Sequence, residues 1–498
     1  MPQKKKPATS SPASPEQPPA PVPQTPDDNQ SAEAAMQTMP APPTTAMVVG
    51  HKEQKLIEWM MSHPREVMRQ RQEMIMTLTK RRCFYGREGG AMPITLTPLF
   101  LGTDAVGRIS KAAETFDRVI DKVVNGYRDD PYVRSHFLYT DLPKEWIDWD
   151  PGYAKPTVLN RHDALFDGKN LKFIEFNTDN PGGRAWLDTL EEIFRAYPMY
   201  EELIASYGKP FERSMLKSVM DSLISCYRDA GGDKPNPRVG LVSYKEYLLG
   251  SDIEITRDYL VENGVDAHFI DPRDFEYRDG GLFSGRVRFD IVNLCIRFLF
   301  FKKFPREMKD FLDATRDRVV TPVNPWRAII GAHKEAMSFI SNPVNHHYFT
   351  EEEQTCIREH LPWTRRLDET VTISPDGTDV SMQEFLLHNR ERLVLKPGHG
   401  AGGQDVKVGR TTDVATWNAY VRDVIGCPWW IVQEAVPVPE YEIPVLKGGK
   451  VVLEKRFLNI NPYVFNGKYA GCLGRVSESN VVNVSSGGGI IPVFPLKE

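Results

Sequence analysis

The clearest prediction about the fold of this chain comes from residues 157–183, TVLNRHDALFDGKNLKFIEFNTDNPGG. Two segments rich in apolar residues, HDALFD and LKFIEFN, flank the turn Asp167-Gly168-Lys169-Asn170. An Asp-Gly pair between two such segments is a strong hairpin signal, because these residues adopt the backbone angles of a tight turn at little cost. The stretch therefore predicts an antiparallel β-hairpin.

Three oxygen donors lie on this hairpin, Asp163 on the first strand and Glu175 and Asn177 on the second. Glu175 and Asn177 are two residues apart, so they project from one face, and the turn brings Asp163 toward that face. Such oxygens suit magnesium, which keeps positions for water and phosphate. Arg161 shares the face of Asp163 and is a candidate to bind phosphate or carboxylate bidentately. The alternative is a solvated sheet face with a turn-capping aspartate, which strand alternation alone does not exclude.

A glycine-rich stretch, LVLKPGHGAGGQDVKVGR at residues 393–410, has Gly398, Gly400 and Gly403 at the spacing of a dinucleotide-binding fingerprint. That fingerprint needs a helix after the glycines, whose free N–H groups hold a pyrophosphate. Here the following residues alternate like a strand, and the Gly-Lys-Ser/Thr of a P-loop is missing. The stretch predicts a glycine-tipped β-hairpin with Lys396 just before the tip, where it can fold over phosphates.

Composition excludes several classes of protein. The formal net charge of −5 argues against a large nucleic-acid-binding surface. No apolar run approaches the roughly 18 residues of a membrane span. The six cysteines are scattered without a Cys-x-x-Cys pair, as expected for reduced thiols in a cytoplasmic protein. The first 50 residues are rich in proline and lack aromatic residues, so they are expected to form a disordered tail.

The length of 498 residues predicts two or three packed subdomains. Strand and helix patterns alternate between residues 236 and 322, as in a small doubly wound α/β unit. Together with the shifts in composition, this divides the chain into four parts: a tail (1–50), a segment with N-terminal helices and the hairpin (51–235), the α/β unit (236–322) and a C-terminal segment with the glycine-rich hairpin (323–498).

The helical patterns outside the α/β unit include the following three. Residues 51–82 predict an amphipathic helix that is broken or kinked at Pro64, with its methionines in the core. Residues 107–127 predict a second helix that ends at Gly126, and residues 324–340 predict a third. The chain from Trp429 onward is instead rich in strand patterns.

Several further residues are candidates for binding. Lys334 is a candidate phosphate lysine, although an exposed helical lysine is commonplace. Gln433 and Glu434 close an apolar strand, where free backbone groups could read an adenine, and a simple strand end is the alternative. Arg475, on a predicted strand, is placed to face a transferring phosphate. The glycines at 487–489 would let backbone approach a substrate carboxylate. Local sequence decides none of these.

Taken together, these segments resemble the ATP-grasp superfamily of carboxylate–amine ligases. LVLKPGHGAGGQDV is similar to its mobile lid, IVQEAV to its adenine hinge, and Asp163 with Glu175-Phe176-Asn177 to its metal ligands. In ordinary members the metal ligands follow the lid, whereas here they precede it. This order resembles the circularly permuted branch typified by the synthetase domain of glutathionylspermidine synthase, in which an Arg-x-Asp like Arg161-His162-Asp163 precedes a Glu-x-Asn.

The resemblance implies a mixed α/β (α+β) protein with a circularly permuted ATP-grasp fold and the small α/β unit inserted mid-chain. It implies an ADP-forming ligase that uses ATP and Mg²⁺, activates a carboxylate as an acylphosphate and joins it to an amine. The implied roles are metal ligation by Asp163, Glu175 and Asn177, charge stabilisation by Arg161 and Arg475, and nucleotide binding by Lys334, Lys396, Gly402, Gly403, Gln433, Glu434 and Val436.

The expected substrates are a small carboxylate and an amine, drawn from amino acids, short peptides or polyamines, with Arg297 a candidate for carboxylate binding. No nucleic-acid or membrane partner is expected, and the sequence leaves open whether the chain forms a homo-oligomer. Two other functions fit the same residues. One is a regulatory or scaffold protein that binds ATP without catalysis, and the other is a phosphotransferase on the same fold.

Overall fold

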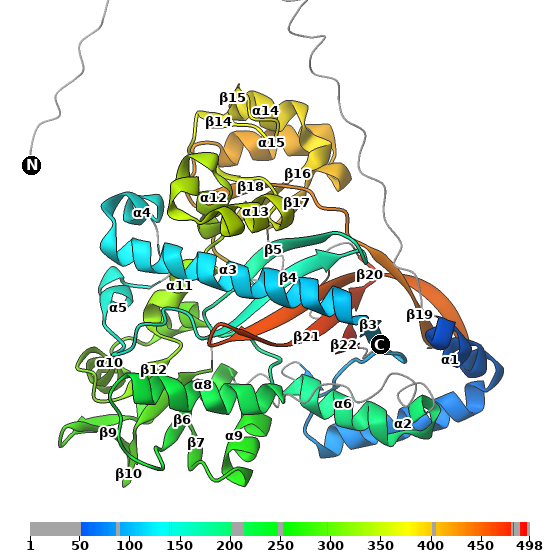
Figure 1. Ribbon diagram of the computed structural model, residues 1–498, viewed down its shortest axis with the longest axis horizontal. Coiled ribbons are helices and arrows are strands. Elements are labelled where there is room, and N and C mark those ends of the chain that lie inside the picture. The colour runs from blue at the N-terminus through cyan, green and yellow to red at the C-terminus, as the bar shows by residue number, and fades with distance from the viewer. Residues whose placement is uncertain are drawn as a thin grey trace, which may run out of the picture. The chain divides into compact units, whose positions relative to one another are not determined.

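The computed structural model describes residues 51–85, 90–138, 140, 142–201, 214–247, 252–295, 297–400, 405–479, 482 and 489–495. The predicted tail, the lid glycines Gly402 and Gly403, and the glycines at 487 and 488 lie outside these residues. The described chain is a mixed α and β protein with several separate sheets (Figure 1). None of its helices is both long and apolar enough to cross a bilayer.

The N-terminal helical pattern is confirmed, including its break. Helix α1 (His51–Ser62) ends before His63, and α2 (Pro64–Lys80) begins at Pro64. Proline suits the first turn of a helix because its missing N–H would have no intrahelical partner there. Met60 and Met74 are buried, as the predicted core role of the methionines requires, but Met76 is 56% exposed, so the prediction is wrong for that residue.

The largest sheet of the described chain has seven strands. It combines strands from the first 180 residues with strands from the C-terminal segment. Its order is β3-β22-β21-β20-β4-β5, with β19 also paired to β20. The predicted hairpin is its β4–β5 edge, and β20 pairs antiparallel with β4 across about 300 residues of sequence, Ile460 opposite Ala164. The strands are β3 (Leu99–Leu101), β4 (Leu159–Phe166), β5 (Leu171–Asn177), β19 (Glu440–Lys447), β20 (Lys450–Phe465), β21 (Lys468–Ser477) and β22 (Gly489–Pro495).

Helix α3 (Thr103–Asp129) crosses the β4–β5 hairpin in Figure 1. Its Phe116 ring lies 4.9 Å from that of Phe173 on β5, between centroids, so aromatic packing fixes the helix on the sheet. The predicted end at Gly126 was wrong, because α3 continues for three more residues. Gly126 instead permits close packing, since a Cβ there would lie 3.0 Å from Val133 of α4 (Pro131–His136).

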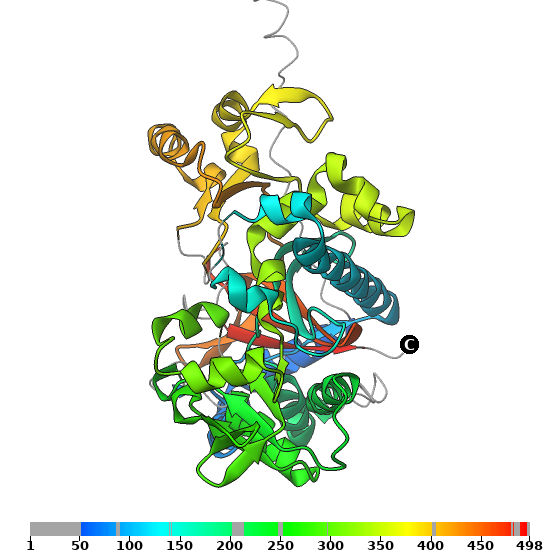
Figure 2. The ribbon, with the colours of Figure 1, turned by 90° about the vertical axis from the view of Figure 1, so that its left-hand side faces the viewer.

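The mid-chain segment forms a four-stranded parallel sheet, as its alternating pattern predicted. Its strand order is β12-β11-β6-β7, and Figure 2 shows this segment in green with helices beside the strands. An antiparallel meander that the pattern analysis missed separates β7 from β11, with turn residues Asp279 and Gly280 at positive φ. The elements are α8 (Met215–Asp229), β6 (Val239–Val242), α9 (Asp252–Glu262), β7 (Ala267–Ile270), β8 (Glu276–Arg278), β9 (Gly281–Ser284), β10 (Val287–Phe289), β11 (Ile291–Leu294), α10 (Lys309–Arg316) and β12 (Thr321–Val323).

The glycine-rich stretch belongs to a separate four-stranded sheet of order β13-β18-β16-β17. Its stem is the predicted antiparallel hairpin, with Val394 opposite Val408 and Leu395 opposite Lys407. Trp417 is fully buried beneath this sheet and donates from Nε1 to the Leu386 carbonyl at 3.0 Å. The elements are β13 (Thr364–Arg366), α14 (Met382–His388), β16 (Leu393–Pro397), β17 (Lys407–Val408), α15 (Val414–Val424) and β18 (Trp430–Glu434).

The single helix predicted over residues 324–340 was wrong. The structure contains a short 3₁₀ turn, α11 (Ile329–Ala332) and α12 (Lys334–Ser341), which are separated by His333 in an extended conformation. The break makes Lys334 the first residue of a helix. The Lys334 backbone N–H then donates outward to the Gly398 carbonyl at 3.0 Å, which ties α12 to the end of β16.

Candidate functional site

The β4–β5 hairpin brings the three predicted oxygen donors together. Its turn is held by the Asp167 carboxylate, which accepts from the backbone N–H groups of Lys169 and Asn170. The register then pairs Asp163 with Glu175 and Arg161 with Asn177. The Asn177 amide nitrogen lies 3.3 Å from Asp163 Oδ1, so the three side chains form one group.

Two guanidinium groups face the Asp163 carboxylate. Arg475, on β21, donates from Nη2 to Asp163 Oδ2 at 2.5 Å, and Arg161 Nε donates to Oδ1 at 3.1 Å. Burial by itself raises the pKa of Asp163, but Arg475 and Arg161 outweigh it and hold that pKa below its usual value. Asp163 is therefore a charged carboxylate at neutral pH, although its residue is only 5% exposed.

Two lysines reach the same group from separate elements. Lys334 Nζ, at the start of α12, lies 3.0 Å from Glu175 Oε1. Burial raises the pKa of Glu175, yet the Lys334 ammonium brings it below the usual value. Lys396 Nζ, from β16, donates to the Ile174 carbonyl at 3.3 Å and to Gln433 Oε1 at 2.6 Å. Burial lowers the pKa of Lys396 to about 8, against the opposing charge of Glu175.

The predicted adenine hinge differs from the open strand edge that was one of the two interpretations of its sequence. The Glu434 and Ala435 backbone N–H groups donate to the Trp363 and Arg392 carbonyls at 2.8 and 2.7 Å. The Gln433 side chain is buried against Lys396, and Glu434 Oε1 lies 3.1 Å from Arg392 Nη2. The Val436 backbone N–H, which follows them, has no hydrogen bond to a described residue, and Pro437 after it has no N–H to donate.

Two buried asparagines support the group and were missed in the sequence. Asn459 and Asn461, on β20, accept from Arg475 through their Oδ1 atoms at 3.2 and 2.8 Å. The sequence did contain a sign of them, because two asparagines at i and i+2 interrupt the otherwise apolar strand FLNINPYVF. Their effect is to orient the Arg475 guanidinium toward Asp163.

Arg297 lies beside this group, where its charge helps to lower the pKa of Glu175, and the lid glycines lie outside the described residues. Arg297 Nε is 3.4 Å from Asp179 Oδ2, on the segment that follows β5. Gly402 and Gly403, at the predicted tip of the lid, are outside the described residues, and their predicted role in nucleotide binding stays a prediction.

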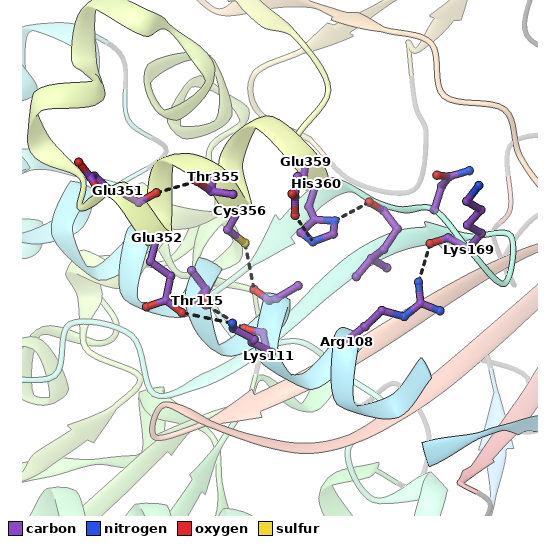
Figure 3. A pocket seen from close by; sticks show the side chains of 13 residues that line it. Arg108, Lys111, Thr115, Lys169, Glu351, Glu352, Thr355, Cys356, Glu359 and His360 are labelled. Atoms are coloured by element: carbon purple, nitrogen blue, oxygen red, sulfur yellow. Dashed lines mark hydrogen bonds and ion pairs between the residues drawn. The ribbon is translucent and has the colours of Figure 1, made fainter. Parts of the chain in front are cut away.

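A surface cavity of about 660 Å³ lies elsewhere, between α3, the β4–β5 turn and α13 (Glu351–His360). Figure 3 shows Arg108, Lys111 and Lys169 on one side of it and three glutamates of α13 on the other. Of the described hairpin residues, only those at the turn line this cavity, and none of the predicted site residues does. The cavity is therefore separate from the group around Asp163.

No family profile matches the sequence, and no curated protein matches it. Among solved structures, the chain is similar to a glutathione synthetase-like effector from Globodera pallida, with a TM-score of 0.59 and 11% identity. The match covers 87% of this chain and 98% of the effector. A candidate gamma-glutamylcysteine synthetase from Methylobacillus flagellatus has 12% identity over 74% of this chain and 84% of that one, but its TM-score of 0.38 supports no argument. The likeness to the effector extends over almost all of that protein, so the two share a fold.

Proposed function

We propose that this protein is an ADP-forming carbon–nitrogen ligase with a circularly permuted ATP-grasp fold. The observation that carries the proposal is the convergence of Lys334 and Lys396, from two separate elements, on a hairpin face that holds Asp163 and Glu175. Buried and half-buried cations beside carboxylates are a suitable arrangement for a metal-bound polyphosphate, because each lysine can exchange its carboxylate or carbonyl partner for a phosphate oxygen. The likeness to a glutathione synthetase-like protein is consistent with this class of reaction.

The hairpin residues fit a magnesium ion by the chemistry of their donors. Two carboxylates and one amide lie within one group, to which no described residue contributes a thiol or an imidazole. Asp163, Glu175 and Asn177 would hold Mg²⁺, whose charge would draw the phosphate oxygens of ATP into this face and neutralise them. The lysines that now pair with protein oxygens would then pair with phosphate.

The reaction itself needs positioning and charge stabilisation by the chain. The γ-phosphoryl group of ATP bonds to an oxygen of the substrate carboxylate while its bond to the β-phosphate oxygen breaks, which releases ADP. The amine nitrogen then bonds to the acyl carbon, phosphate leaves with the C–O bonding pair, and the nitrogen loses a proton to solvent. Arg161 and Arg475 are the groups that would stabilise the charge on the transferred phosphoryl group, which is supported by their position around Asp163.

The four-stranded sheet that carries Lys396 is proposed as the lid, since its hairpin stem approaches the β5 backbone at Ile174. Closure of such a lid would keep water from hydrolysing the acylphosphate. Val436 would read the adenine, and the mid-chain parallel sheet is proposed as a wall of the substrate site. An amino acid or a short peptide is the proposed carboxylate substrate.

The test is incubation of the full chain with Mg-ATP and pools of amino acids, dipeptides and polyamines. ADP and phosphate are followed, and mass spectrometry searches for a product one water lighter than two inputs. Glu175→Gln and Lys396→Ala are assayed in parallel with Lys468→Ala, which removes an exposed lysine from the β20–β21 end of the same sheet.

A condensation product formed by the wild type and by Lys468→Ala, but by neither site variant, supports the ligase and names its substrates. Phosphate transfer that continues without any amine would instead identify a phosphotransferase. Tight binding of ATP without turnover in any pool would favour the regulatory protein and count against the ligase.

A further inference from the structure

A second group of metal-binding side chains lies beside the proposed nucleotide site. His333 and Glu335 flank Lys334 at the start of α12, and His399 follows β16 two residues after its end. Their candidate ligand atoms all lie within 4.8 Å of one another. The group therefore joins Glu335 to His399, which lie 64 positions apart in the sequence.

The three side chains are closely packed. His399 Nε2 is 3.2 Å from Glu335 Oε1, and the His333 and His399 ring centroids are 4.1 Å apart. His333 and Glu335 are 1% and 3% exposed, whereas the His399 side chain is 19% exposed. The site is thus buried on the helix side and has access to solvent through His399.

The Glu335 carboxylate provides an independent indication of a ligand. Its Oε2 atom is buried and has no hydrogen-bond partner among the described residues. A buried carboxylate oxygen without a partner is costly, and metal coordination is one way to compensate it. Gly398 makes room for this carboxylate, because a Cβ at Gly398 would lie only 2.4 Å from Glu335 Oε1.

We propose that His333, Glu335 and His399 bind one divalent transition-metal ion of the Zn²⁺ type. Two imidazoles and a carboxylate are a ligand set that Zn²⁺ uses, with a fourth position left for water. Bonds of about 2.0–2.2 Å place tetrahedral ligand atoms roughly 3.3 Å apart, so small rotations of these side chains suffice. Magnesium prefers oxygen ligands, which separates this site from the Asp163 group.

The ion links the lid stem to the helix of the phosphate lysine. Lys334 lies between two of the ligands, its backbone N–H bonds the Gly398 carbonyl at 3.0 Å, and its Nζ is 3.4 Å from the Gly400 carbonyl. Coordination of His399 fixes the segment Gly398–Gly400 against α12. The site stands on its own geometry and does not depend on ligase activity.

The experiment uses the full chain after removal of metal with a chelator. It is titrated with Zn²⁺, with bound metal measured by inductively coupled plasma mass spectrometry, and with Co²⁺, whose visible absorption reports four-coordinate geometry. The wild type is expected to bind one equivalent with the Co²⁺ band of a tetrahedral site, and Mg²⁺ in excess is not expected to displace it.

His399→Gln and Glu335→Gln are expected to weaken Zn²⁺ binding by at least about tenfold, since each removes one of three protein ligands. Glu175→Gln, in the other group, and His360→Gln, on α13, are expected to bind Zn²⁺ like the wild type. Circular dichroism of each metal-free variant controls for folding. A wild type that takes up no Zn²⁺ at micromolar concentration overturns the proposal whatever the variants do. Equal affinity in the wild type and in folded His399→Gln does the same.

Discussion

The two groups around Glu175 and Glu335 differ in how the charge of their carboxylates is balanced. On the β4–β5 hairpin, Asp163 faces Arg475 and Arg161, and Glu175 faces Lys334. At the start of α12, Glu335 faces imidazoles and keeps one buried oxygen without a hydrogen bond among the described residues. Guanidinium and ammonium groups can exchange their carboxylate partners for the phosphate oxygens of a metal–phosphate complex, whereas imidazoles can themselves become ligands of a metal. Lys334 lies between these groups, because its side chain contacts Glu175 and its neighbours in sequence are His333 and Glu335.

The largest effect is expected where the hairpin group loses its central cation. Arg475→Ala leaves Asp163 with only Arg161 and removes the donor that Asn459 and Asn461 share. We expect the free energy of unfolding to fall by about 3–5 kcal/mol, as for other broken buried pairs. Urea denaturation measures this change. Arg278→Ala, at an exposed pair on β8, should change stability by less than about 0.5 kcal/mol. Similar losses in both variants would mean that the hairpin charges are not strongly coupled.

A smaller effect is expected at the close contact beneath the second group. Gly398→Ala places a methyl group against the Glu335 carboxylate, and we expect a loss of about 2 kcal/mol from this overpacking. In a Glu335→Ala background the methyl group has room, so Gly398→Ala should lower the free energy of unfolding clearly less than it does in the wild type. Thermal unfolding of the double-mutant cycle provides the measurement. Additive losses would show that Gly398 is not required by Glu335.

The pH dependence of nucleotide binding distinguishes Lys396 from a permanent cation. Burial lowers the pKa of Lys396 to about 8, so its ammonium is lost as the pH rises through that value. Affinity for Mg-ATP should therefore be full below pH 8 and fall by up to about tenfold per pH unit above it. Folding follows the opposite sign, because burial disfavours the charged Lys396 in the folded state. This penalty is relieved as the pH rises from about 8 toward the unfolded pKa, so the contribution of Lys396 to stability increases with pH.

Lys396→Arg is the matched variant, because a guanidinium stays charged across this range. Calorimetric titration with a non-hydrolysable ATP analogue at pH 7 and pH 9 compares the two proteins. The arginine variant should lose less affinity than the wild type between these values. Parallel slopes would assign the pH dependence to another group.

The smallest effect is expected at the strand end that carries Glu434. Arg392 and Glu434 form a pair with side chains 26% and 35% exposed, and such pairs contribute less than about 1 kcal/mol. Arg392→Ala should therefore lower stability only slightly in urea denaturation, and the loss should shrink further in high salt. A loss as large as that of Arg475→Ala would remove the distinction between buried and exposed charges.

Local patterns predicted the elements well wherever one turn or one proline decides the backbone. The Asp-Gly turn predicted the β4–β5 hairpin, and Pro64 predicted the break between α1 and α2. Patterns failed where packing overrides a local preference. Gly126 does not end α3, because it fits against Val133, and His333 interrupts a stretch whose periodicity favours one helix.

The sequence alone determined the donors: period-two spacing placed Glu175 and Asn177 on one strand face, and the turn placed Asp163 opposite them. The tertiary structure decided which charges meet these donors. Arg475 reaches Asp163 across 312 residues because β20 and β21 pair beside β4, and His399 reaches Glu335 because β16 ends against α12. Such contacts depend on the register of strands that are distant in sequence, and local periodicity, which describes only one element at a time, carries no information about that register.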